Sequence, residues 1–217
     1  MSPMAEYRVR NIHEDFALPG DTGFWEGVTA AKVEHYLWLK NGYEPRVEAR
    51  LCCSPNFLYV YFKAWEARVR ARYANFQDPV YKDSCVEFFF DPFPEKNLGY
   101  INIETNALGT MLIHFGRERG TRVPIPRDDL AGSEVRPSIT APVEGAHGAD
   151  LWTLAYRLPL SLFEKYYGGR IAAGRTARGN FYKCGDETEI PHYGSWNPVG
   201  SAKPDFHLPE YFGRIQF

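Results

Sequence analysis

Short segments in which apolar and polar residues alternate are the feature that most constrains this chain, and no long helical period separates them. The alternation is clean in 46–53 and 57–64, which a turn-like Ser-Pro-Asn joins. Further segments of this kind are 85–92, 100–106, 109–115, 134–141, 150–160, 178–186 and 212–217. This spacing predicts an all-β fold, an antiparallel β-sandwich of jelly-roll or immunoglobulin-like type, rather than a doubly wound sheet.

The composition agrees with strands joined by turns. Of the 217 residues, 16% are aromatic, a class that favours pleated surfaces, and 19 Gly and 16 Pro supply turns. Helix is expected only as one or two short pieces: 161–169, which ends in two glycines, and at most a short piece in 21–38. No repeat or linker is visible, so the sequence predicts a single domain over residues 1–217.

Net charge and hydropathy limit the classes of partner that we expect for this protein. The net charge of -2 gives no basic surface for phosphates, so no nucleic-acid partner is expected. No apolar run is long enough for a membrane span, and the N-terminus lacks the apolar core of a signal peptide. The sequence as written therefore reads as cytoplasmic; a chain trimmed of its signal peptide would look identical, which leaves the compartment open.

Four cysteines, Cys52, Cys53, Cys85 and Cys184, are expected to be buried free thiols. Cys52 and Cys53 are neighbours on one predicted strand, so their side chains point to opposite faces. No C-x-x-C pair is present, and we therefore predict no zinc site.

Polar residues gather on one face of two predicted strands. Alternation places Asn102, Glu104 and Asn106 opposite Ile101 and Ile103, and Glu87 lies on the corresponding face of its own strand. Amides and carboxylates beside large aromatics suit a sugar, since they bind hydroxyl groups while rings stack on the pyranose. The alternative is that these polar groups only hold neighbouring loops.

Two C-terminal stretches raise the same question. Lys183 stands between Tyr182 and Cys184 within a strand, and it either extends to an edge or faces a ligand. In 204–217, aromatic residues including Phe206 surround two prolines, and they either close a core or form a wall beside a ligand.

Five motifs together resemble carbohydrate-binding module family 9, in its family 9-like branch, over about residues 47–217. They are KDSCVEFFFDP (82–92), YINIETNALGT (100–110), GNFYKCGD (179–186), HYGSWNP (192–198) and PDFHLPEYFGRIQF (204–217). The resemblance implies a DOMON-like β-sandwich that binds a mono- or oligosaccharide without catalysis, assisting a separate glycan-degrading enzyme in carbohydrate catabolism.

The family grips its sugar between two aromatic side chains, and the resemblance places these at Tyr81 and Phe206. The family's best-known pair consists of two tryptophans, so the smaller rings here imply weaker stacking. The resemblance adds Glu87 as the polar partner of the first ring. The remaining polar contacts that it implies fall on Asn102, Glu104, Lys183 and Lys203. It implies no catalytic residue.

Two other functions fit parts of the sequence. Paired carboxylates such as Glu87 and Glu104 could serve a glycoside hydrolase. A haem-binding DOMON-like domain would need two axial ligands in one pocket, but Met111 and His114 point to opposite faces of their strand. No cofactor is expected, although the acidic runs 128–134 and 186–189 leave room for a structural calcium ion.

Overall fold

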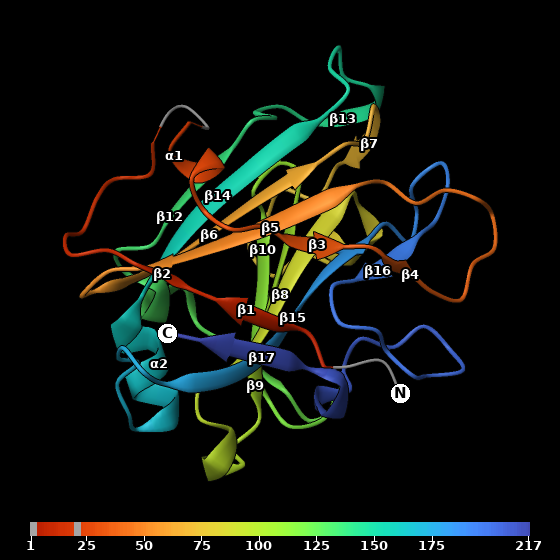
Figure 1. Ribbon diagram of the computed structural model, residues 1–217. Coiled ribbons are helices and arrows are strands. Elements are labelled where there is room, and N and C mark those ends of the chain that lie inside the picture. Colours follow the sequence, from red (N-terminus) through yellow and green to blue (C-terminus); the bar gives the residue numbers. More distant parts are fainter. Residues whose placement is uncertain (1–3, 20–22) are drawn as a thin grey trace.

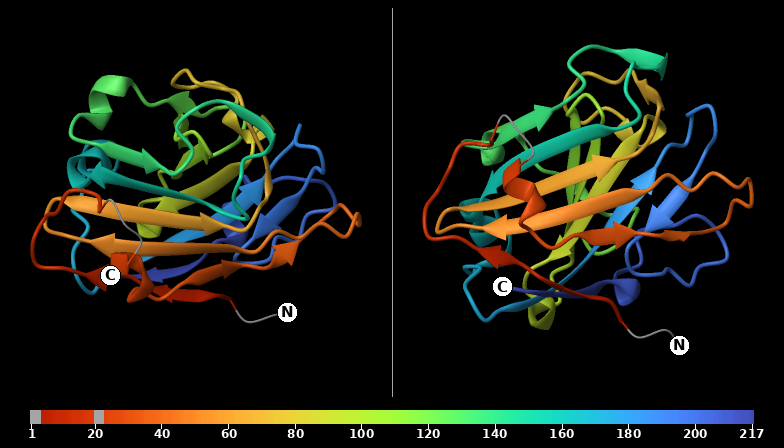
Figure 2. Two further views of the ribbon diagram at one scale, coloured as in Figure 1. Left: turned by 90° about the horizontal axis from the view of Figure 1, so that it is seen from above. Right: turned by 45° about the horizontal axis from the view of Figure 1, so that its top comes forward.

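Two β-sheets lie face to face in the computed structural model, which describes residues 4–19 and 23–217 (Figures 1 and 2). Figure 1 shows the sheet of β14, β6 and β5 in front of the sheet of β10, β9 and β8. The predicted β-sandwich is therefore confirmed. Asp21 and Thr22, at the start of the expected N-terminal helical piece, lie outside the described residues.

The larger sheet, which we call the large sheet, combines strands from the N-terminal, middle and C-terminal parts of the chain. Its order is β1 (Glu6–Arg8), β17 (Gly213–Gln216), β15 (Thr176–Cys184), β8 (Cys85–Asp91), β9 (Tyr100–Asn106), β10 (Met111–Gly116) and β11 (Val123–Pro124). The short strand β16 (Tyr193–Ser195) pairs with the end of β15 and with β4 (His35–Tyr36). These additions lie at one end of the sheet, where the candidate site is found.

The second sheet holds the predicted hairpin. Its order is β12 (Glu134–Pro137), β14 (Trp152–Pro159), β6 (Phe57–Ala64), β5 (Val47–Cys53) and β2 (Arg10–Asn11), with β3 (Ala31–Val33) also paired to β5. A separate two-stranded ribbon joins β7 (Arg68–Ala71) to β13 (Val143–Ala146).

Two pairings differ from the antiparallel prediction. Strand β1 is parallel to β17, and β2 is parallel to β5. The N-terminal segment thus adds to the edge of the large sheet and then, two residues later, to the edge of the other sheet. The backbone N–H and C=O groups of this one short segment therefore pair with the edge strands of both sheets.

Helix is scarce, as predicted. The helices are α1 (Gly23–Glu26) and α2 (Leu160–Tyr167), and Gly168 ends α2 in a left-handed conformation with φ 62°. In residues 4–19 and 23–217 there are also four 3-10 turns: η1 (Val80–Lys82), η2 (Pro94–Lys96), η3 (Arg127–Leu130) and η4 (Pro209–Tyr211). Within the described ranges, no helix has the length and apolar character needed to cross a membrane.

The main core lies between the sheets. Phe62 and Leu154 of one sheet meet Phe88 and Phe181 of the other, and the rings of Phe88 and Phe181 stack at 4.8 Å. Alternation explains the placement, because every second residue of each strand points inward.

The other face of the large sheet is also apolar. We call this second group the outer cluster, and Phe89, Tyr100 and Tyr182 are its strand members. Val199, Phe206 and Phe212 cover it from the segment that leads to β17. The central strands β8 and β9 are consequently buried on both faces.

Lys183 lies within the sandwich rather than on the outer face. Its ammonium group forms a fully buried ion pair with Glu66 at 3.2 Å and donates to Nε2 of His192 at 2.6 Å. Trp152 Nε1 and Ser84 Oγ also donate to the Glu66 carboxylate, at 2.9 and 3.0 Å. Burial and the Lys183 charge lower the pKa of His192 to about 2, so its imidazole is neutral and accepts the hydrogen bond.

Replacing Lys183 should destabilise the fold strongly, because Glu66 would keep a buried charge without a cation. For Lys183→Ala we expect a loss of about 3–5 kcal/mol in the free energy of unfolding, measured by urea denaturation. The double variant Lys183→Met with Glu66→Gln should recover part of this loss, since both charges are removed.

The matched control is Lys165→Ala, which removes an exposed partner of Asp129 and should change stability little. A loss for Lys183→Ala no larger than that of the control would contradict a structural role for the buried pair.

Candidate functional site

A cavity of about 400 Å³ lies on the outer face of the large sheet. Strands β8, β9, β10 and β15 contribute its floor, and loops before β5, before β8 and before β17 contribute its walls. The aromatic lining side chains are Trp38, Tyr81, Tyr193 and Phe206. The charged, histidine and remaining lining residues are Glu87, Glu104, Leu112, His114, Arg119, Arg122, Cys184, Asp186, Pro204, Asp205 and His207.

Four of the seven predicted site residues meet at this cavity: Tyr81, Glu87, Glu104 and Phe206. Tyr81 comes from turn η1, the two glutamates come from neighbouring strands, and Phe206 comes from the loop before β17. More than 100 residues of chain separate Tyr81 from Phe206, so the sheet order brings them together.

The other three, Asn102, Lys183 and Lys203, do not line the cavity. Lys183 shares the inward face of β15 with Phe181, because residues two apart in a strand point the same way. Lys203 is exposed on the loop that leads to Phe206. Asn102 is on the expected face but fully buried, and its amide donates to Glu104 from below the cavity surface at 2.9 Å.

Glu87 and Glu104 form the polar floor of the cavity. They are directly opposite one another in the pairing of β8 with β9, and both are nearly buried, at 3% and 4% exposed. The Cys184 thiol donates to Glu87 at 3.0 Å. Neither carboxylate forms an ion pair within 4 Å with a lysine, arginine or histidine in the part of the chain that the structure describes.

Burial raises the pKa of both glutamates. For Glu87 the negative charge of Glu104 adds to the effect of burial, and its pKa lies well above the usual range. Burial raises the pKa of Glu104 to about 7, although Arg122 and the hydrogen bond from Asn102 act in the opposite direction. Near neutral pH the pair therefore holds a proton, and it can both donate to and accept from a hydroxyl group.

The aromatic wall is built on the outer cluster. The Phe206 ring stacks on Tyr182 with centroids 4.1 Å apart, and the Tyr182 hydroxyl donates to the Phe206 carbonyl at 3.1 Å. One face of Phe206 is thus occupied by protein, and the side chain is only 8% exposed. Phe206 is both a plug over the sheet and part of the cavity wall.

Trp38 extends this wall, although no sequence pattern predicted it as a site residue. Its ring is tilted against Phe206 at 5.7 Å and meets Tyr193 edge-on at 6.0 Å. Its Nε1 donates to the Ser201 carbonyl at 2.7 Å, and its backbone has φ 68°, an uncommon value for a bulky residue. No motif identifies such a loop residue, because only its contacts with 193–206 place it at the site.

Tyr81 is held by the backbone of its turn. Asp186 donates its N–H to the Tyr81 carbonyl at 3.1 Å, which ties the loop after β15 to the turn before β8. Two residues on, the buried Asp83 carboxylate accepts from Arg70 and from two backbone N–H groups. The turn is therefore fixed from below, while the half-buried Tyr81 ring lines the cavity.

Basic and imidazole groups also line the cavity. Arg122 Nη1 is bonded to the Tyr100 hydroxyl at 3.3 Å and to the His207 ring. Burial and Arg122 lower the pKa of His207 to about 2, so this imidazole is neutral. Arg119 and Arg122 form no ion pair within 4 Å with a described carboxylate. The sequence predicted no role for either arginine, because both lie in an irregular loop.

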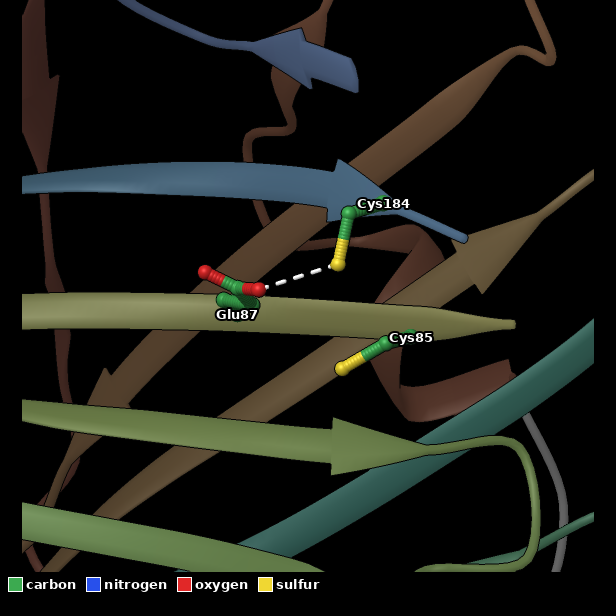
Figure 3. A group of neighbouring side chains, drawn as sticks. All are labelled: Cys85, Glu87 and Cys184. Atoms are coloured by element: carbon green, nitrogen blue, oxygen red, sulfur yellow. Dashed lines mark hydrogen bonds between the residues drawn. The ribbon is translucent and has the colours of Figure 1, made fainter. Parts of the chain in front are cut away.

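Two thiols adjoin the carboxyl pair. Figure 3 shows Cys85 and Glu87 on strand β8 and Cys184 on β15, with the Cys184 thiol directed at Glu87. Cys85 and Cys184 are directly opposite one another in the strand pairing. Sequence spacing does not reveal this pair, because the sheet brings together two cysteines that are far apart in the chain.

The acidic runs 128–134 and 186–189, considered above as calcium sites, form ion pairs with lysine and arginine side chains. Asp129 pairs with Lys165 at 2.6 Å. Glu187 pairs with Lys82 and Arg70, each at 2.9 Å, and Glu189 pairs with Arg68. These contacts account for much of the negative charge in both runs.

Solved structures share this fold. A protein of Bacteroides uniformis ATCC 8492, to which carbohydrate binding has been ascribed, is 30% identical with a TM-score of 0.88, and the match covers 99% of this chain and all of that one. A carbohydrate-binding module family 9 of Caldicellulosiruptor kristjanssonii is 14% identical with a TM-score of 0.63. That module has been solved in complex with glucose and with cellotriose, and each match covers 98% of this chain. The match covers 95% of the chain in the glucose complex and 93% of the chain in the cellotriose complex.

The two sequence comparisons gave different results. No curated protein matches the chain. The sequence profile of carbohydrate-binding family 9, in contrast, matches residues 25–217, which include every strand from β3 to β17 and all the residues that line the cavity. This chain belongs to carbohydrate-binding family 9.

Proposed function

We propose that the cavity on the large sheet binds a mono- or oligosaccharide and that the protein does not catalyse a reaction on it. The observation that supports this most is the meeting of half-buried aromatic rings with two buried carboxyl groups in one cavity of about 400 Å³. Sites for small molecules commonly combine apolar walls with a few polar groups in volumes of about 300–1,000 Å³. Family membership and the sugar complexes of the Caldicellulosiruptor module agree with this proposal.

Each part of the cavity matches a part of a sugar. A pyranose has an apolar face of C–H groups, which stacks on an aromatic ring, and an edge of hydroxyl groups, which needs donors and acceptors. Trp38 and Tyr81 supply ring surface, since both are only half-buried. Glu87 and Glu104 supply carboxyl groups at the floor, and Arg122 supplies N–H donors beside them.

Phe206 has a different role from the one the family pair implies. Because Tyr182 already occupies one of its faces, Phe206 supports the Trp38 ring more than it exposes a surface of its own. We infer that the stacking surfaces are Trp38 and Tyr81, with Phe206 behind Trp38.

The geometry favours binding over the two alternatives. A glycosidase needs carboxyl groups on both sides of the scissile bond, whereas Glu87 and Glu104 are neighbours on one sheet face. For haem, Met111 packs in the main core while His114 lines the cavity, and His207 is bonded to Tyr100 and Arg122. We therefore propose a non-catalytic module that assists a separate enzyme in glycan breakdown.

Removing either exposed ring should weaken sugar binding without unfolding the protein. For Trp38→Ala and Tyr81→Ala we expect more than a tenfold loss of affinity, since truncating a central aromatic commonly costs about 2 kcal/mol. The ligand is chosen with a glycan array, and glucose and cellotriose serve as first probes in titration calorimetry. Tyr81→Phe should keep most of the affinity, because the stacking ring remains.

Trp65→Ala is the matched control, since Trp65 is a half-buried tryptophan that does not line the cavity and contacts Arg46. Unchanged binding by Trp38→Ala and Tyr81→Ala, or an equal loss in Trp65→Ala, would contradict the proposed stacking site.

Phe206→Ala should lower both stability and affinity. The variant removes a buried ring from the outer cluster, for which we expect a loss of about 3 kcal/mol in unfolding free energy and a melting temperature several degrees lower. Differential scanning calorimetry beside sugar titration separates this residue from Tyr81, whose truncation should leave the melting temperature close to that of the wild type. A Phe206→Ala variant with wild-type stability would show that the ring is not a structural support.

A further inference from the structure

Cys85, Glu87 and Cys184 present three metal-binding atoms to one point. The two sulfur atoms and a carboxylate oxygen all lie within 4.8 Å of one another, and the distance from Cys184 Sγ to Glu87 Oε1 is 3.0 Å. Pairing of β8 with β15 sets this arrangement: Cys184 is opposite Cys85, and Glu87 is two residues further on the same face (Figure 3). Ligands of a tetrahedral zinc ion, each about 2.0–2.3 Å from the metal, lie at similar separations from one another.

The charge around these three residues favours a cation. Buried carboxylates are normally paired with a cation or coordinate a metal, as Glu66 is paired with Lys183. Glu87 is nearly buried at the cavity floor, and among the described residues its one hydrogen-bond donor is the Cys184 thiol. Glu104 lies opposite it, and Asp186 follows Cys184 by two residues, so two further carboxyl groups lie near the same point.

We propose that Cys85, Glu87 and Cys184 form a binding site for a thiophilic divalent cation of the zinc class, at the floor of the cavity. Thiolate and carboxylate together match the preference of zinc, whereas calcium and magnesium prefer oxygen ligands alone. Glu87 and Cys184 line the cavity, which leaves a fourth coordination position on the cavity side. Three protein ligands with one open position are typical of zinc sites that accept an exogenous ligand.

Binding changes the protonation of the thiols. Burial raises the pKa of both cysteines, so each carries its proton in the metal-free protein. When the metal binds, both S–H bonds are broken, and the O–H bond of Glu87 is broken where this carboxyl group carries the proton of the pair. These protons leave to solvent, and two metal–sulfur bonds and one metal–oxygen bond form. No electron is transferred, and no other reactant is needed.

The same two thiols could be joined instead by oxidation. Directly opposed residues on antiparallel strands lie close enough for a disulfide, which would remove both metal ligands. The structure has all four cysteines free. A disulfide is therefore an alternative that the test must distinguish from a metal site.

The test is a cobalt titration of the full chain, reduced and freed of metal by a chelator, with no sugar present. We expect one equivalent of Co²⁺ to produce a thiolate-to-cobalt charge-transfer band and tetrahedral visible bands, and Zn²⁺ to displace them. One equivalent of Zn²⁺ should also raise the melting temperature, because a ligand of the folded state stabilises it.

Matched variants locate the site. Cys85→Ser with Cys184→Ser should lose the charge-transfer band, while Cys52→Ala with Cys53→Ala, which removes two buried thiols outside the cavity, should keep it. Cys184→Ser alone retains a donor to Glu87 and should keep the fold with about half the band. Glu87→Gln should weaken Co²⁺ binding about tenfold or more, as even outer partners of metal ligands alter affinity by about 10–100-fold.

Several results would overturn the proposal. These are the absence of a charge-transfer band in the wild type, or a band that survives loss of both Cys85 and Cys184. Protein purified without reductant that is two hydrogens lighter, and in which only Cys52 and Cys53 react with a thiol reagent, would show the disulfide instead. Sugar binding is measured separately, so loss of the metal site would leave the proposed function standing, and the reverse also holds.

Discussion

Burial of the central strands on both faces is the constraint on which the rest of the structure depends. One face of β8, β9 and β15 packs against the opposite sheet, and the other supports the outer cluster. A strand buried twice has no solvent face for polar residues, so every polar side chain on it needs a partner or a ligand. The candidate site lies where the cover over the outer face is incomplete and the polar residues of β8 and β9 reach a cavity.

The buried charges divide into two kinds. Glu66 and Asp83 are neutralised by Lys183 and Arg70, and they hold loops and sheets together. Glu87 and Glu104 have no such cation within ion-pair distance among the described residues, and burial raises the pKa of both. Unpaired buried carboxyl groups lower the free energy of unfolding, and they are typical of positions that bind a ligand.

The alternation rule describes both β9 and β15, and the family resemblance departed from it on β15. On β9 it separated Ile101 and Ile103, which enter the main core, from Glu104, which reaches the cavity. Applied to β15 it would have put Lys183 inside with Phe181, but the resemblance to the family placed Lys183 among the ligand contacts. Alternation along the strand describes the position of Lys183, because successive side chains of a pleated strand point to opposite faces of the sheet.

Sequence alone determined the sandwich, most strand positions and the polar face of β8 and β9, since these depend on local alternation, turns and aromatic content. It also indicated Tyr81, Glu87, Glu104 and Phe206 through motifs. Only the tertiary structure decided that Trp38 joins the aromatic wall and that Phe206 is covered by Tyr182. It likewise decided that two cysteines 99 positions apart in the sequence (184 minus 85) face one another beside a carboxylate. The physical reason is that strand order and loop packing bring distant residues together, and no local pattern in the chain records them.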